Sequence, residues 1–275
     1  MNRFENIMIV SDMDGTFLGE KGTLVPRNLE AISYFCAHGG KFTFASGRSH
    51  DYIMLSVPHP EEIINLPSVA VNGVGLYDFE QNRYVETYPI DASVSELLVE
   101  RVFTVYPHVG IRLITGDRVL IGNLHNPYMK EEWERVASLD RRIITSVEDV
   151  RGISPFKIVL RADSEVLAVV WRELEQELGD RLVFTKSGET LVETMTVGHN
   201  KGTMVKHLQR TYAPETTLLC AVGDFLNDLE MLEVADLPVC PANACEEVKA
   251  RCKLCLCDHK EGVIADLIEY LDKQM

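Results

Sequence analysis

The chain has 275 residues, of which 46% are hydrophobic and 25% are charged, as in ordinary folded proteins. Its formal net charge of −15 repels nucleic-acid backbones and anionic membrane surfaces. We therefore expect no nucleic-acid partner and no membrane association. An anionic substrate would need a local site that overcomes this charge. The length fits one large domain or two modest ones.

No apolar run approaches the roughly 18 residues of a membrane span, and the first residues lack the profile of a secretory signal. The chain has seven cysteines, an odd number in a protein too large to depend on disulfides. We therefore expect reduced thiols and a cytoplasmic protein. No feature of the sequence indicates an oligomeric state.

The first part of the chain alternates between strand and helix patterns. Ile7–Val10 is a continuous apolar run, typical of a strand buried on both faces. A helix is predicted over Arg27–His38, with strands at Lys41–Ala45 and Ser68–Val71. Strands that alternate with helices in this way predict right-handed crossovers and a parallel sheet.

The pattern changes after about residue 76. Tyr77–Ile90 resembles a hairpin, and the mixed helices and strands that follow predict an inserted α+β module over 86–190. The alternation resumes near Lys201, so 1–85 and 191–275 are expected to form one discontinuous α/β core. Its second part has predicted helices at Gly202–Arg210, Asn227–Val234, Ala244–Arg251 and Gly262–Lys273, and predicted strands at Leu218–Val222, Leu237–Val239 and Leu254–Cys257.

Two carboxylates directly follow the first strand. Asp12 and Asp14 are expected at its carboxyl end, which is where open parallel sheets bind ligands. Carboxylates one residue apart repel each other, and a metal ion or a raised pKa relieves the repulsion. An acidic turn before Gly15 is the alternative, and it would be preferred if this motif stood alone.

Three further polar segments occur at predicted strand ends or helix starts. Ser46-Gly47-Arg48 follows the second strand, and Lys201 opens a helix whose N-terminus attracts anions. Asp224, Asn227 and Asp228 follow the buried strand Leu218–Val222, in a pattern suited to a metal ion. Taken singly, these segments also fit a capped turn, a surface lysine and an acidic loop.

Together and in this order, the four segments resemble the motifs of the haloacid dehalogenase superfamily, and within it the Cof-like phosphatases with a type IIB cap. Asp12-Met13-Asp14-Gly15-Thr16 matches the D-x-D-G-T motif of that family. The resemblance implies a Rossmann-like parallel-sheet core with an inserted α+β cap that governs substrate specificity. It also implies a Mg²⁺-dependent phosphatase that hydrolyses small phosphorylated metabolites through an aspartyl-phosphate.

The resemblance and the chemistry of the residues assign the same reacting groups. Asp12 is expected to attack phosphorus, and Asp14 to protonate the leaving group and then activate water. Mg²⁺ is expected on the Asp12 carboxylate, the Asp14 main-chain carbonyl and Asp224, with Asp228 holding waters around the ion.

The phosphate group is expected to contact a second set of residues, which comprises Met13, Ser46, Gly47, Lys201 and Asn227. Arg48 and Asn72 are expected on the side that faces the substrate and the cap. The chain departs from the family at Phe225, where a small residue is frequent, and at Asn200, where Ser or Asp is common. Neither change removes a reacting group, but both are expected to alter the shape of the pocket.

Three alternatives share this set of residues. A phosphomutase would pass the phosphoryl group to an acceptor instead of to water. A phospho-acceptor signalling module would use the same acids and lysine as a switch, but such modules are much smaller and have no inserted cap. A metal-binding protein without activity is the third alternative, although every reacting residue is present. The motifs do not distinguish among sugar phosphates, pyridoxal phosphate and flavin mononucleotide as substrates.

Cysteines are concentrated near the C-terminus. Cys252, Cys255 and Cys257 with His259 raise the possibility of a zinc site. However, Leu254–Cys257 has the pattern of a buried strand, and alternate residues of a strand point to opposite faces. The sequence therefore favours buried structural thiols.

Overall fold

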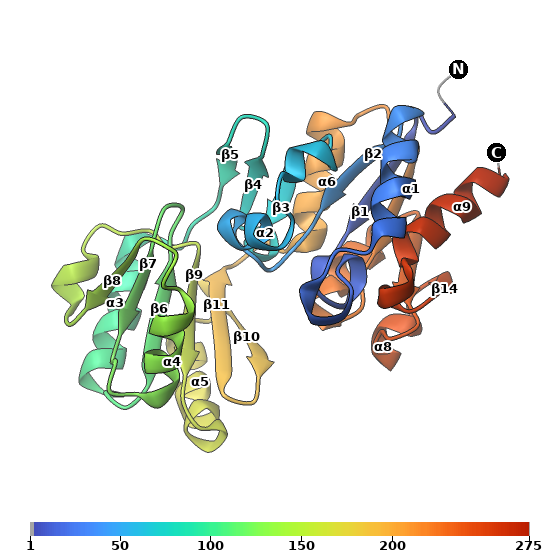
Figure 1. The fold of residues 1–275 in the computed structure, drawn as a ribbon. Coiled ribbons are helices and arrows are strands. Elements are labelled where there is room, and N and C mark those ends of the chain that lie inside the picture. Colours follow the sequence, from blue (N-terminus) through green and yellow to red (C-terminus); the bar gives the residue numbers. More distant parts are fainter. Residues whose placement is uncertain (1–2, 275) are drawn as a thin grey trace. The chain divides into compact units, whose positions relative to one another are not determined.

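The computed structural model describes residues 3–274, apart from the side chain of Ser187. The chain forms two compact units (Figure 1). Unit 1 combines Met1–Glu86 with His199–Met275, and unit 2 is the continuous segment Thr87–Gly198. Each unit has its own cluster of buried hydrophobic side chains.

Unit 1 contains a five-stranded parallel sheet, as the sequence predicts. Its strand order is β14-β13-β12-β1-β2. Each pair of neighbours in this sheet is parallel. The strands are β1 (Ile7–Ser11), β2 (Lys41–Phe44), β12 (Leu218–Val222), β13 (Leu237–Pro241) and β14 (Leu254–Leu256).

Helices cover this sheet, and a small second sheet extends the unit. Helices α1 and α9 contact each other and lie side by side in Figure 1. The longest helix of the described chain is α5 (Ser164–Leu178) in unit 2, which has 15 residues. No helix within residues 3–274 is long and apolar enough to cross a membrane. The helices of unit 1 are α1 (Pro26–Ala37), α2 (His50–Ser56), α6 (Lys201–Tyr212), α7 (Leu229–Glu233), α8 (Glu246–Lys249) and α9 (Val263–Gln274), and the small sheet contains β3 (Ser68–Ala70), β4 (Gly75–Asp78) and β5 (Arg83–Thr87).

The continuous apolar run of β1 is explained by burial on both faces. Ile9 packs in one cluster with Phe35 of α1 and Leu267 of α9. Met8 and Val10 alternate to the opposite face and are also fully buried. A strand covered on both sides cannot carry polar residues at alternate positions, so the first polar reacting group comes only after the strand has ended.

Unit 2 is a six-stranded sheet with three helices. The strand order is β10-β11-β9-β6-β7-β8, in which β7 and β8 are parallel and the other neighbours are antiparallel. This mixed sheet agrees with the predicted α+β character of the insertion. The strands are β6 (Gly110–Ile114), β7 (Val119–Gly122), β8 (Arg141–Ile144), β9 (Lys157–Arg161), β10 (Leu182–Gly188) and β11 (Leu191–Thr196), and the helices are α3 (Ala92–Thr104), α4 (Pro127–Arg135) and α5 (Ser164–Leu178).

The C-terminal boundary of the insertion lies later than the sequence analysis placed it. The expected boundary was residue 190, but β11 pairs with β9 and β10 and therefore belongs to unit 2, which extends to Gly198. The apolar alternation of a strand shows that one face is buried, but it does not show which sheet the strand joins. At the other end, unit 2 begins at Thr87, one residue from the expected position.

Because each unit has its own hydrophobic core, we predict that a cavity made in the core of one unit leaves the structure of the other unit intact. Leu160 of β9 is fully buried in the cluster of unit 2, so Leu160→Ala should destabilise that unit by about 2–5 kcal/mol. Hydrogen exchange should then accelerate at amides of β6 and β9, but not at amides of β1 and β12. Val169→Ala is the matched control, because Val169 is 51% exposed and its truncation should change stability by less than about 0.5 kcal/mol. Equal loss of protection in both units would show that they unfold together.

Candidate active site

Three polar segments meet where neighbouring strands of the parallel sheet end. β1 lies between β2 and β12, so the chain leaves β1 toward β2 on one side and returns through β12 on the other. The loops after such strands diverge and leave a crevice at their carboxyl ends. Asp12 follows β1, Ser46 follows β2 and Asp224 follows β12. The amide of Asp12 donates to the carbonyl of Val222 at 2.8 Å, which brings the two acidic segments together.

The ammonium group of Lys201 occupies the centre of this edge. Its side chain is fully buried, and Nζ lies 2.5 Å from Oδ1 of Asp12 and 2.7 Å from Oδ1 of Asp228. Lys201 is the first residue of α6, and Asn200 caps that helix by accepting a hydrogen bond from the amide of Thr203 at 2.8 Å. Asn200 therefore performs the ordinary work of an N-cap residue, which accounts for this departure from the family pattern.

Asp228 holds the loop after β12 in a tight turn. Its Oδ2 accepts hydrogen bonds from the amides of Asp224 at 2.9 Å and Phe225 at 3.1 Å. A Cβ atom on Gly223 would lie 2.5 Å from Cβ of Asp228, so this turn requires glycine. One carboxylate thus binds the lysine with one oxygen and shapes the loop with the other.

Asp224 is held from the loop after β1. Thr16 Oγ1 donates to its Oδ1 at 2.7 Å. Gly15, directly before Thr16, has a φ of +74°, and a Cβ atom there would lie 2.5 Å from Oδ2 of Asp224. The glycine and the threonine of the first motif are therefore explained by the approach of this carboxylate.

The three carboxylates form a cluster with more negative charge than Lys201 neutralises. Ligand atoms of Asp12, Asp224 and Asp228 all lie within 4.8 Å of one another. Burial raises the pKa of Asp12, against the opposing effect of Lys201, and burial raises the pKa of Asp224 to about 6. Burial alone would lower the pKa of Lys201, but the carboxylates of Asp12 and Asp228 outweigh it and raise that pKa. Two buried carboxylates and one half-buried carboxylate with this excess charge fit a Mg²⁺ ion.

Asp14 has a partner that the sequence analysis did not assign to it. The guanidinium of Arg48 binds both of its carboxylate oxygens, at 2.7 and 2.6 Å. The Asp14 side chain is 60% exposed, whereas the Asp12 side chain is 9% exposed. Arg48 also donates to the hydroxyl of Ser56 and to the carbonyl of Tyr52. The two aspartates of the first motif therefore differ sharply, since one is buried on a lysine and the other is held at the surface by an arginine.

The other residues expected to contact phosphate include Ser46, Gly47 and Asn227. Ser46 is buried, and its Oγ accepts from the amide of Arg48 at 3.2 Å. The amide nitrogen of the Asn227 side chain donates to Oδ1 of Asn72 at 3.3 Å, and that same oxygen is where a Cβ on Gly47 would collide. Asn72, expected on the side facing the substrate and the cap, is thus a neighbour of Asn227 and Gly47, which are expected to contact phosphate.

Met13 and Phe225 differ in the exposure of their side chains. The Met13 side chain is fully buried in the hydrophobic cluster of unit 1, so only its backbone is suited to phosphate. Phe225 is 55% exposed beside Asp224, although it is a large apolar residue. Its side chain therefore presents an apolar surface to solvent, one residue after Asp224 in the chain.

The sequence did not indicate the contacts that orient the acids. Thr16 binds Asp224, Arg48 binds Asp14, and Asn243 donates to the carbonyl of Gly15 at 2.8 Å. Thr16 and Arg48 belong to the motifs described above. The sequence therefore indicated these two residues, but not the carboxylates that they bind. Asn243 belongs to no motif, and nothing in the sequence around it indicates this contact.

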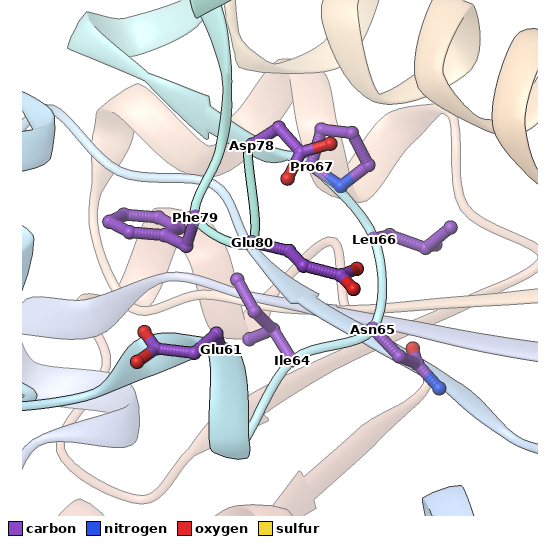
Figure 2. Close-up of a pocket in the computed structure, with 8 residues that line it drawn as sticks. All are labelled: Glu61, Ile64, Asn65, Leu66, Pro67, Asp78, Phe79 and Glu80. Carbon is purple, nitrogen blue, oxygen red and sulfur yellow. The ribbon is translucent and has the colours of Figure 1, made fainter. Parts of the chain in front are cut away.

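Unit 1 also has a separate small cavity of about 80 Å³. The carboxylates of Glu61, Asp78 and Glu80 lie around it (Figure 2). Three acidic groups repel a phosphate ester, so this cavity does not suit the expected substrate. Its lining consists of Glu61, Ile64, Asn65, Leu66, Pro67, Asp78, Phe79 and Glu80.

Comparison with known proteins agrees with this geometry. Residues 9–268 match the family model described as haloacid dehalogenase-like hydrolase. The chain belongs to this family. The resemblance seen in the sequence is thereby confirmed, and the protein is a hydrolase of the phosphatase type.

Relatives in this family match the chain over nearly its whole length. A pyridoxal phosphate phosphatase of Escherichia coli is 26% identical, with 95% of this chain and 97% of that protein covered. A 5-amino-6-(5-phospho-D-ribitylamino)uracil phosphatase of Bacillus subtilis is 23% identical, with 96% and 97% covered. A haloacid dehalogenase-like hydrolase from Bacteroides thetaiotaomicron superposes with a TM-score of 0.83 at 24% identity, with 96% and 98% covered. This similarity confirms the predicted α/β fold with its inserted module.

The contact between Gly15 and Asp224 can be tested with a matched pair of variants. Gly15→Ala and Gly22→Ala place alanine at φ values of +74° and +77°, but nothing lies within 4 Å of a Cβ at Gly22. Both variants should pay about 1–2 kcal/mol of backbone strain. Only Gly15→Ala should also displace Asp224, and a displacement worth about 1.4 kcal/mol in the transition state lowers kcat/KM about tenfold. Similar activities for the two variants would contradict the proposed importance of this contact.

Proposed function

We propose that this protein is a Mg²⁺-dependent phosphatase that hydrolyses small phosphate monoesters through a covalent phosphate on Asp12. The observation that carries the proposal is the carboxylate of Asp12, fixed at the end of β1 by Lys201 and adjoined by Asp224 and Asp228. Positioning and electrostatic stabilisation supply most of the catalysis of phosphoryl transfer. A buried, immobilised carboxylate beside an ammonium group meets both requirements.

Asp12 suits the role of nucleophile better than Asp14 does. Its position directly after a buried strand and its 2.5 Å contact with Lys201 restrict its motion. Asp14 lies in a loop, and its exposed side chain is bound only at the surface by Arg48. A group that must donate a proton and later accept one needs access to solvent, which the exposed Asp14 has, whereas an attacking oxygen benefits from fixation.

In the first step, a carboxylate oxygen of Asp12 attacks phosphorus, and the bond between phosphorus and the leaving oxygen breaks. Asp14 gives its proton to that leaving oxygen as the alcohol departs. Both Asp14 oxygens accept hydrogen bonds from Arg48 in this structure, so the first step requires the side chain of Asp14 to turn away from Arg48 and to take up a proton from solvent before it donates one. Arg48 is therefore proposed to hold Asp14 until the substrate arrives.

In the second step, Asp14 takes a proton from a water molecule, and that water attacks the phosphorus on Asp12. The bond between phosphorus and the Asp12 oxygen breaks, which frees phosphate and restores the carboxylate. Lys201 stays beside Asp12 throughout and stabilises negative charge on the phosphoryl oxygens. Ser46 and the backbone at Gly47 are proposed to bind the same oxygens.

The ion would be held by the carboxylates of Asp12 and Asp224 and the main-chain carbonyl of Asp14, with Asp228 binding waters around it. When bound, Mg²⁺ supplies positive charge that offsets the phosphate and the excess of carboxylates. Lys201 alone cannot offset this excess, because it already pairs with two of the three carboxylates.

The substrate is proposed to be a small phosphorylated metabolite. The named relatives act on pyridoxal phosphate and on a phosphorylated ribitylaminouracil, which share a phosphate monoester on a compact organic group. The residues around Asp12 are proposed to bind the metal ion and the phosphate group, and every such ester carries the same phosphate group. We therefore propose that unit 2 discriminates among substrates, and a screen of phosphate esters with and without Mg²⁺ is the direct test of this class.

Removal of the divalent ion should abolish hydrolysis. Treatment with EDTA is expected to eliminate phosphate release, and added Mg²⁺ should restore it. Asp224→Asn removes one charge from the cluster and should raise the Mg²⁺ concentration needed for half-maximal activity. Asp180→Asn is the control, because this side chain is 79% exposed in unit 2 and should leave that concentration unchanged. Full activity of verified metal-free protein in EDTA would disprove the assignment of the metal.

The roles of the two aspartates can be separated by trapping the phosphoenzyme. Asp12→Asn should eliminate covalent phosphorylation, since an amide is a poor nucleophile. Asp14→Asn should keep phosphate binding but slow both steps by about 10²–10⁴-fold, because an amide neither donates the proton nor activates water. Mass spectrometry of the rapidly quenched enzyme locates the phosphate. A label on Asp14, or on neither residue with good substrates, would overturn the assignment.

A further inference from the structure

The loop after β13 contacts both of the loops that carry the acidic residues. β13 is the neighbour of β12 in the parallel sheet, so its loop emerges at the same edge as the loops after β1 and β12. The side-chain amide of Asn243 donates to the carbonyl of Gly15 at 2.8 Å. Two residues later, the backbone amide of Cys245 donates to the carbonyl of Asp224 at 3.0 Å. Residues 243–245 therefore join the loop after β1 to the loop after β12.

Asn243 uses both ends of its side-chain amide. While Nδ2 donates to the carbonyl of Gly15, Oδ1 accepts a hydrogen bond from the backbone amide of His259 at 3.0 Å. The amide group cannot turn over without losing both contacts, because a carbonyl only accepts and a backbone amide only donates. The side chain of Asn243 is therefore held in one orientation although the residue is exposed. A fixed amide nitrogen is suited to hold a carbonyl in one direction.

His259 holds the loop after β1 at a second point. Its Nδ1 lies 2.6 Å from the carbonyl of Leu18, and Nδ1 carries the hydrogen because a carbonyl only accepts. The sequence raised the possibility that His259 joins three cysteines in a zinc site, whereas the structure directs Nδ1 to this carbonyl. One of those cysteines, Cys255, is exposed because β14 is the last strand of the sheet, which corrects the expectation of a buried strand.

Gly15 is the residue of this loop that most needs an outside contact. Glycine adopts a wider range of backbone angles than other residues, and Gly15 has a φ of +74°. The peptide group before it carries the carbonyl of Asp14, which is a proposed ligand of the metal ion. The residue after it is Thr16, whose Oγ1 donates to Asp224 at 2.7 Å. The direction of the Gly15 carbonyl therefore affects two of the groups that would hold the ion.

From these contacts we propose that Asn243 is a positioning residue for the divalent ion. By holding the carbonyl of Gly15, it sets the spacing between the carbonyl of Asp14 and the carboxylate of Asp224. This inference rests on the Mg²⁺ site of the proposed function. Mg²⁺ demands nearly ideal octahedral geometry with ligands at about 2.0–2.1 Å, whereas Ca²⁺ accepts irregular geometry at about 2.3–2.6 Å. A loop held at a fixed spacing favours the ion with the stricter demand, and a loosened loop loses that preference.

The test is the binding of Mg²⁺ and of Ca²⁺ to the full-length protein, each measured by isothermal titration calorimetry without substrate. Loss of one neutral hydrogen bond corresponds to a change in Kd of roughly three- to tenfold. Asn243→Ala should therefore weaken Mg²⁺ binding by about this factor and Ca²⁺ binding by less, so that the ratio of the two Kd values shifts toward Ca²⁺. Equal weakening for both ions, or no change for either, would overturn the proposal.

Asn65→Ala is the matched control. Asn65 is also exposed in unit 1, its Nδ2 donates to the carbonyl of Gly40 at 2.9 Å, and its Oδ1 accepts from the amide of Phe42 at 2.9 Å. These contacts lie at the start of β2, at the opposite end of that strand from Ser46. Both variants lose the same two kinds of hydrogen bond, so their melting temperatures should fall similarly, but only Asn243→Ala should change the ratio. An equal change of the ratio in Asn65→Ala would refute a specific role of Asn243.

Asn243→Asp removes only the donor and decides the question if Asn243→Ala does not fold. The aspartate has the shape of asparagine and keeps the acceptor for His259, but it has no hydrogen to give to Gly15. Its added charge attracts both divalent ions alike and cancels in the ratio, which should again shift toward Ca²⁺. Wild-type protein that does not bind Mg²⁺ would reject the metal site of the proposed function. Wild-type binding with an unchanged ratio in the variants would reject only the role of Asn243.

Discussion

The buried ammonium of Lys201, held between Asp12 and Asp228, is the interaction on which the rest of the site depends. Removing a charged group from water is costly, and only close partners make the burial tolerable. Here one partner follows β1 and the other follows β12, while the lysine itself begins α6. A single side chain therefore fixes the ends of two strands and the start of a helix relative to one another.

Most of the core and the main site residues could be predicted, because the underlying rule is geometric. Parallel strands end at one edge of their sheet, so polar residues that follow apolar runs must gather there. Asp12 and Asp224 were expected together on this ground, and the structure places both within one cluster. Lys201 needed the family resemblance as well, because a lysine at a helix start is ordinarily solvent-exposed.

The remaining features depend on contacts between distant segments, which no local pattern records. The pairing of Arg48 with Asp14 follows from the way the loop after β2 approaches the loop after β1. The exposure of Cys255 follows from the position of β14 at the end of the sheet. In the same way, the residues of β11 show an alternating strand, but only its neighbours β9 and β10 show that it belongs to the inserted unit.

The pairing of β1 with β12 has a consequence for how the chain reaches its folded state. Ile7 lies beside Leu218 in the finished sheet, and all of unit 2 is synthesised between them. Strand β1 therefore cannot pair with β12 until β12 has left the ribosome, much later in synthesis. Unit 2 is continuous and can fold as soon as it emerges. A folded insertion shortens the effective loop that joins β1 to β12 and so reduces the entropy lost when they pair. The inserted unit, which separates β1 from β12 in the sequence, thus helps these two strands to pair during folding.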